Sequence, residues 1–414
     1  MDPSEQFERV RLADVADVVR GVTYKKDDAT LVPTEGWIPI LRANNIQEGS
    51  LQLEGELVYV KPTSVNNGQV LQKGDIVIAT SSGSKDLVGK AAPLRNDWYG
   101  SFGAFCAVVR PKKNILPLYL VHFLGSPEYK DLITKKALGV NINNLRRGDL
   151  EELQIPLPPL PQQRRIVEAI ELQLGRLDAA VASLQAAKAR LKRYKQAVLK
   201  AAVEGAYSET PVEGWTDNVL GDIAITIRNG YSKKPDAKDG IRIFRISAVR
   251  PLELFVDDVR YLDPLTKDHE ASLVSPGDVL FTRYNGSRDM VGACALVPDD
   301  CPPTVHPDKL IRVRVPNDEL LPGMLAILGT VGEGRDYIES KIRTTAGQSG
   351  ISGGDLKSLP LRYPPLKEQN RIIGEVESRL TGMQELESIL DVELQRSTRL
   401  RQAVLKRAFE GRLV

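Results

Sequence analysis

The sequence predicts an α+β protein that contains two copies of one unit, each a mixed body of strands, loops and short helices followed by a long helix. Three observations predict this fold. The chain matches itself at an offset of about half of its 414 residues, Gly-Asp turn-and-strand patterns recur in both halves, and both halves end in a long apolar heptad pattern. At roughly 150 residues per domain, the length suits two or three domains.

Composition excludes several classes of protein. Hydrophobic residues make up 42% and charged residues 27%, which is typical of a folded globular chain. The formal charge is only +2, so any basic surface must arise from local segregation of charge. Three cysteines are too few for a disulfide framework or a four-ligand zinc site. No apolar run reaches the ~18 residues of a membrane span, and the first residues do not resemble a signal peptide. We therefore expect a cytoplasmic protein without membrane association.

The internal repeat sets the domain organisation. Gln196–Gly205 reads QAVLKAAVEG and Gln402–Gly411 reads QAVLKRAFEG, identical at eight of ten positions. Earlier parts match less closely, with eight identities in 22 between Leu71–Ala92 and Val274–Ala295. A two-copy repeat of this size indicates a duplicated domain rather than a solenoid. We expect diverged bodies and closely similar helices, at 1–155, 156–205, 206–362 and 363–414 in chain order.

Within the bodies, turn-then-strand signals recur at equivalent places. Gly74-Asp75 precedes Ile-Val-Ile-Ala, and Gly277-Asp278 precedes Val-Leu-Phe-Thr. Gly, Asn, Ser and Pro punctuate the chain after these runs and predict loops. Mixed strand and loop is therefore the expected content of each body.

The tails predict long helices. Pro-Pro-Leu precedes each, and Gly205 and Gly411 suit C-terminal caps. A heptad seam is predicted at Ile170, Leu174, Leu177, Val181, Leu184, Lys188, Leu191, Lys195, Val198 and Ala202, and at Val376, Leu380, Met383, Glu387, Leu390, Leu394, Ser397, Arg401, Val404 and Ala408. Each helix could lie along its own body. A helix from Pro161 to Val203 would however be roughly 64 Å long, which favours pairing of the two helices as a coiled coil.

Charge predicts how the helices pair. The late part of the first helix is basic, whereas the early part of the second is acidic. Antiparallel pairing places these opposite charges together and relates the two bodies by a pseudo-two-fold axis.

The sequence contains no recognisable catalytic or metal-binding pattern. The three histidines, His122, His269 and His306, are scattered, and no Walker A sequence or adenine-methyltransferase motif is present. We therefore expect a binding scaffold with no catalytic residues, no metal and no cofactor of its own.

Loops rich in groups that contact base edges and phosphates recur at equivalent repeat positions. Arg can contact guanine through two hydrogen bonds, Asn and Gln can contact adenine, and Ser or Lys can hold phosphate. The framework around these loops matches while the loop residues differ, which suits two sites that read different sequences. The candidates are Lys25, Lys26, Ser81, Ser82, Ser84, Lys85, Asn141, Asn143, Asn144 and Arg146 in the first half, and Tyr231, Lys233, Lys234, Arg283, Tyr284, Asn285, Ser287, Arg288, Gln348 and Ser349 in the second.

Two diverged bodies that each end in these helix motifs resemble the specificity subunit of Type I restriction–modification systems. The resemblance implies two target-recognition domains, each reading half of a bipartite double-stranded DNA site. It also implies partners: two modification subunits that methylate adenine with S-adenosylmethionine, and restriction subunits that use ATP and Mg²⁺. The helices would set the spacer between half-sites and dock the modification subunits, with Gln163, Arg190, Lys192, Arg193, Gln369 and Arg399 as candidate contacts. The alternative is an adaptor whose two bodies bind protein.

Overall fold

The chain forms two compact units, and the first is assembled from two separate stretches of sequence. The computed structural model describes residues 7–47, 49–82, 87–137, 144–263, 267–345 and 347–413. The first unit comprises residues 1–185 and 391–414, and the second comprises residues 186–390. Each unit therefore contains part of both long helices, α5 (Leu160–Val203) and α11 (Leu366–Phe409).

The first unit is organised around an antiparallel four-stranded sheet in the order β2-β11-β8-β9. A second sheet has the order β10-β4-β7-β3, and β1-β12 and β5-β6 form two-stranded ribbons. The elements are β1 (Arg9–Arg11), α1 (Leu12–Val15), β2 (Ala16–Arg20), β3 (Ala29–Thr30), β4 (Ile38–Leu41), β5 (Ile46–Gln47), β6 (Ser50–Leu51), β7 (Val58–Val60), β8 (Ile76–Ala79), β9 (Ala91–Pro93), β10 (Ser101–Phe102), β11 (Cys106–Pro111), α2 (Pro117–Leu124), α3 (Pro127–Ala137), α4 (Arg147–Glu151) and β12 (Gln154–Pro156).

The second unit repeats this plan. Its central sheet has the order β14-β23-β19-β21, with β18-β15-β22 as the second sheet and β13-β26 and β16-β17 as ribbons. A third sheet, β20-β25-β24, is added. The elements are β13 (Thr216–Val219), α6 (Leu220–Ile223), β14 (Thr226–Asn229), β15 (Ile241–Phe244), β16 (Val249–Arg250), β17 (Glu253–Leu254), β18 (Val259–Leu262), α7 (Lys267–Glu270), β19 (Val279–Thr282), β20 (Tyr284–Asn285), β21 (Cys294–Leu296), β22 (Thr304–Val305), β23 (Leu310–Arg314), α8 (Pro322–Thr330), α9 (Gly332–Lys341), β24 (Arg343–Thr345), β25 (Gln348–Gly350), α10 (Gly353–Lys357) and β26 (Pro360–Tyr363).

The duplication predicted from the sequence is confirmed in the central sheets, whose four strands have the same order in both units. The strands expected after Gly74-Asp75 and Gly277-Asp278 are β8 and β19, each buried throughout. Both carboxylates are buried, and each accepts two hydrogen bonds from an arginine on the neighbouring strand: Arg110 to Asp75, and Arg314 to Asp278. The carboxylate raises the pKa of each guanidinium. The repeated Gly-Asp therefore fixes the start of the central strand in both units.

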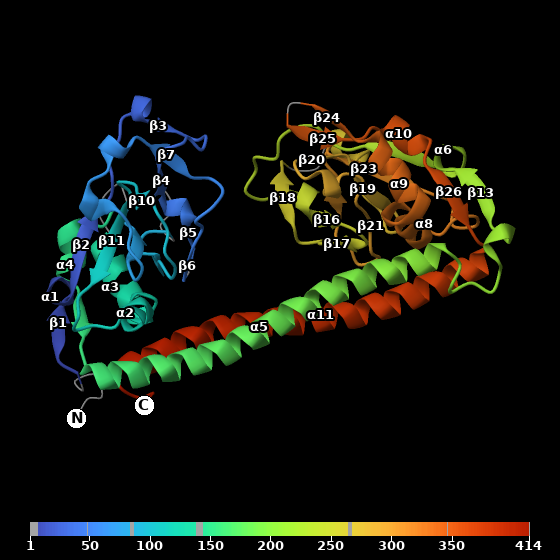
Figure 1. The fold of residues 1–414 in the computed structure, drawn as a ribbon. Coiled ribbons are helices and arrows are strands. Elements are labelled where there is room, and N and C mark those ends of the chain that lie inside the picture. Colours follow the sequence, from blue (N-terminus) through green and yellow to red (C-terminus); the bar gives the residue numbers. More distant parts are fainter. Residues whose placement is uncertain are drawn as a thin grey trace. The chain divides into compact units, whose positions relative to one another are not determined.

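The long helices pair antiparallel, as predicted, and complete the core of each unit (Figure 1). In the first unit Asp178 of α5 pairs with Arg401 of α11, and in the second Arg379 of α11 donates to the Tyr194 hydroxyl (3.1 Å). Every position of the predicted seam except Glu387 is buried or half-buried. Gly205 and Gly411 follow the helix ends with φ of 84° and 69°, as C-terminal caps require.

Candidate nucleic-acid interface

Four segments meet at one end of the central sheet in the first unit. Because β11 runs antiparallel to β2 and β8, the residues after β2 and β8 lie beside those before β11. The amides of Thr80 and Ser81 donate to the Phe105 carbonyl (2.9 and 3.2 Å), and Val22 forms a bridge with Gly103. Ser81 also forms a bridge with Asn144. We call these segments, 21–26, 80–82, 103–105 and 144–146, the loop end of the first unit.

The second unit builds the same arrangement. The Arg283 amide donates to the Lys309 carbonyl (2.8 Å), and the Ile351 amide donates to the Arg283 carbonyl (2.9 Å). β20 pairs with β25, in the place of the bridge between Ser81 and Asn144, and Tyr231 forms a bridge with Pro307. The loop end of the second unit comprises residues 230–234, 283–288, 307–309 and 348–351.

A glycine is needed where two segments of each loop end touch. A β-carbon added to Gly21 would lie 2.0 Å from the carbonyl oxygen of Gly103, and one added to Gly230 would lie 2.4 Å from that of Pro307. Both distances are shorter than any tolerable contact, so each loop end depends on this backbone approach.

The structure brings two of the predicted recognition residues of the first unit into direct contact. Ser81 pairs with Asn144 across the two loops, and Asn144 and Arg146 have exposed side chains. Lys25 and Lys26 are exposed in the same segment as Val22, which forms the bridge with Gly103. Ser84, Lys85, Asn141 and Asn143 lie outside the described residues.

In the second unit the predicted residues form a more connected group. The Arg283 guanidinium lies over the Tyr284 ring, 4.6 Å from its centroid, and donates to the Asp308 carbonyl (3.3 Å). The Asn285 side chain accepts from the Ser287 amide (2.9 Å), which shapes the turn. Lys233, Lys234, Ser287, Arg288 and Gln348 are exposed, and Tyr231 packs edge-on against the His269 ring.

Ser349 differs from its neighbours because it is 6% exposed and its hydroxyl hydrogen-bonds to that of Thr344 (3.0 Å). A buried hydroxyl that is already paired within a sheet holds two strands together and does not face a ligand. The expectation of a direct DNA contact at Ser349 is therefore corrected to a structural role in β25.

Sequence reasoning missed the third segment of each loop end. Phe105 is 67% exposed, and its counterpart by strand register, Lys309, is also exposed. The two turns share no sequence similarity, so the repeat comparison could not align them. The available signal was a phenylalanine within a Gly-Ala-Phe turn directly before a buried strand.

Gln163 and Gln369 are corrected from partner contacts to internal clamps. Both are 0% exposed. The Gln163 side chain accepts from the Leu116 amide (2.8 Å) and donates to the carbonyls of Asn114 (3.2 Å) and Pro158 (2.8 Å). Gln369 repeats this pattern with Leu321, Glu319 and Pro364. Each glutamine ties the start of a long helix to its body. The other predicted helix contacts, Arg190, Lys192, Arg193 and Arg399, are exposed.

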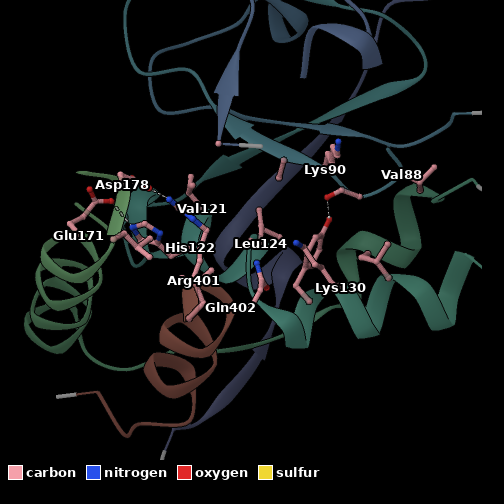
Figure 2. A pocket seen from close by; sticks show the side chains of 18 of the residues that line it. Val88, Lys90, Val121, His122, Leu124, Lys130, Glu171, Asp178, Arg401 and Gln402 are labelled. Carbon is pink, nitrogen blue, oxygen red and sulfur yellow. Dashed lines mark hydrogen bonds and ion pairs between the residues drawn. The ribbon is translucent and has the colours of Figure 1, made fainter. Parts of the chain in front are cut away.

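A pocket of about 540 Å³ lies within the first unit, away from the loop-end residues, and is lined by α2, α3 and both long helices (Figure 2). Figure 2 shows His122 beside Glu171 (2.7 Å) and Arg401 beside Asp178. Burial lowers the pKa of His122, and the Glu171 carboxylate opposes that shift.

No set of three or more His, Cys, Asp or Glu is placed to hold a metal ion among the described residues. None of the described helices is long and apolar enough to cross a membrane.

Two units of one design with different loop-end side chains, each completed by its part of the antiparallel helix pair, define a protein with two related candidate binding sites. The sequence pattern described as the Type I restriction modification DNA specificity domain matches residues 4–192. The EcoKI specificity subunit of Escherichia coli K12 is 37% identical over 97% of this chain and 88% of its own length. The StySPI specificity subunit of Salmonella potsdam is 34% identical over the same shares. The chain belongs to the family of Type I restriction enzyme specificity subunits.

Solved structures agree at the level of the fold. A chain from a study of assembly and conformational transition of the type I R-M system matches with a TM-score of 0.73, at 21% identity over 98% of both chains. The HsdS subunit from Thermoanaerobacter tengcongensis matches with a TM-score of 0.51, at 21% identity over 99% of this chain and 97% of that one.

Proposed function

We propose that the chain is the DNA-recognition subunit of a Type I restriction–modification complex and that each loop end reads one half of a bipartite double-stranded target. The observation that carries this proposal is the twofold construction of the loop end: the backbone arrangement is the same, and the side chains differ. Similar geometry with different donors and acceptors suits two different half-sites. The proposed target-recognition domains are residues 1–155 and 206–362. The comparisons do not favour the alternative of an adaptor that binds protein.

The chain is a targeting subunit, and catalysis belongs to its partners. We propose two modification subunits that carry S-adenosylmethionine and restriction subunits that use ATP and Mg²⁺. The exposed cations Arg190, Lys192, Arg193 and Arg399 are proposed as docking contacts on the long helices.

The central experiment exchanges one domain. Replacing residues 1–155 with the matching domain of a relative, in cells that supply the modification subunits, should change one half of the methylated motif. The other half should stay as it was. A change in both halves, or in neither, would show that the loop ends do not read independently.

Single substitutions test the second loop end. Arg283→Ala and Asn285→Ala should relax recognition of one half-site, at about 1–3 kcal/mol per lost two-hydrogen-bond base contact. Lys233→Ala should instead weaken binding to all sequences about equally and reduce its salt dependence. Arg260→Ala, an exposed arginine of β18 outside the loop end, is the matched control. If the methylated motif stays unchanged in both the Arg283→Ala and the Asn285→Ala variant, this loop does not take part in base recognition.

We also propose that the helices set the spacer between half-sites. α5 and α11 are each continuous over 44 residues. Four residues inserted into each, near Gln185 and Asp391, add about 6 Å and about 40° of rotation. One added base pair supplies about 3.4 Å and about 34°, so the variant should methylate the same half-sites at a spacer longer by one or two base pairs. An unchanged spacer would refute this role.

A further inference from the structure

Phe105 is an exposed aromatic residue in the first loop end. It belongs to the turn that joins β10 to β11, and the residue is 67% exposed to water. We infer that Phe105 stacks on a DNA base within the half-site read by the first unit. This inference rests on the proposed function and names a contact that the sequence patterns did not include.

The backbone holds Phe105 in a fixed position. Its carbonyl accepts the amides of both Thr80 and Ser81, and the Cys106 amide donates to the Gly103 carbonyl (2.8 Å), which closes the turn. Gly103 is held in turn by its bridge to Val22. A ring presented by such a turn loses little backbone freedom on binding, so a contact that it makes is favoured by preorganisation.

The flat aromatic face of Phe105 suits a DNA base as its ligand. Ser81 and Asn144 beside it offer hydrogen bonds to base edges and phosphates, but neither offers an aromatic face. Aromatic side chains stack on bases with little regard to base identity, and apolar residues inserted between base steps are a common device of DNA-binding proteins. The ring therefore supplies the one kind of base contact that its polar neighbours lack.

The second unit supports this assignment at the equivalent position. Strand register places Lys309 where the first unit has Phe105, and Lys309 is also exposed. A lysine there suits a phosphate, as a phenylalanine suits a base face. The same turn thus carries a side chain suited to nucleic acid in both units, although the two turns share no sequence.

The test uses the full chain assembled with its modification subunits. Binding is measured to a duplex that carries the methylated motif and to one in which the first half-site is scrambled. Phe105→Ala and Phe105→Leu should each bind the motif duplex roughly 5- to 150-fold more weakly, and Phe105→Tyr should bind within about twofold of the parent chain, because only Tyr keeps a stacking face. Thermal unfolding should be unchanged, since the side chain is exposed.

Leu31→Ala is the matched control, because Leu31 is 71% exposed in the same unit but lies outside the loop end. It should leave affinity unchanged. Parent-like binding by Phe105→Leu would overturn stacking, and parent-like binding by Phe105→Ala would overturn any contact. If exchange of residues 1–155 changes half of the motif while Phe105→Ala binds normally, this inference alone fails. If the exchange changes nothing, the proposed function fails with it.

Discussion

Replacing Gln163 with glutamate should destabilise the first unit and make its stability depend on pH. The side chain is fully buried, and its amide nitrogen donates to the carbonyls of Asn114 and Pro158. A carboxylate keeps the oxygen that accepts the hydrogen bond from the Leu116 amide. Its second oxygen, however, replaces the nitrogen that donates to the Asn114 and Pro158 carbonyls. Two lost hydrogen bonds, one to a buried proline carbonyl, together with an uncompensated charge, correspond to a loss of about 3–5 kcal/mol at neutral pH.

The pH dependence has a definite sign. Burial and the two facing carbonyls raise the pKa of a glutamate at position 163 above its unfolded value of about 4.3. Folding then favours the protonated form, so lowering the pH through the raised pKa restores part of the lost stability. A protonated carboxyl can also donate to one carbonyl again. Gln163→Ala should lose about 2–4 kcal/mol without this pH dependence.

The assay is chemical denaturation combined with hydrogen exchange, read separately for the two units. Exchange should quicken in residues 111–125 and stay unchanged in residues 316–330, where Gln369 keeps its clamp. Gln173→Glu, at an exposed position of α5, is the control and should change stability by less than about 0.5 kcal/mol. A Gln163→Glu chain with parent-like stability at neutral pH would refute the clamp.

Three further predictions concern other features. Asp278→Asn removes the buried charge that Arg314 contacts with two nitrogens and should cost the second unit about 3 kcal/mol by chemical denaturation, whereas Asn at the exposed Asp217 should change little. Burial lowers the pKa of His306 from 6.5 to about 4, so the unfolded chain binds a proton at this histidine more readily than the folded chain does. The second unit should therefore lose stability as the pH falls from about 6.5 toward 4, which thermal unfolding measures. A flat profile over that range would contradict the burial. Charge reversal of the exposed helix cations should weaken co-purification of the modification subunit while the methylated motif stays the same; the residues are Arg190, Lys192 and Arg193.

The long helices could be predicted closely because their signal is local. A helix predicted from Pro161 to Val203 is observed from Leu160 to Val203, since apolar spacing and flanking Pro and Gly act over neighbouring residues. The strand after Gly74-Asp75 could also be predicted from the sequence, and it is observed as β8. The loop ends were predicted as separate loops only, because their meeting depends on a strand order that joins residues far apart in the chain.

The errors have the same origin. Gln163 sits among exposed polar residues in the first turns of a helix, and nothing in those turns shows that the carbonyls of Asn114 and Pro158 lie opposite. Ser349 resembles any loop serine until β24 is seen beside it. Phe105 belongs to a turn without periodicity, so it became visible only through the amides that bind its carbonyl.

The division of the units along the chain has a consequence for synthesis. The second unit is one continuous stretch, 186–390, but the core of the first needs Val404, Leu405 and Phe409, which follow the second unit in the chain. During translation, the apolar face of α5 in the first unit therefore stays exposed to water until the second unit has been synthesised. The half that is encoded first is thus finished last, the reverse of the usual vectorial order. A stop codon shortly after residue 390 would spare the second unit and leave the first unfinished.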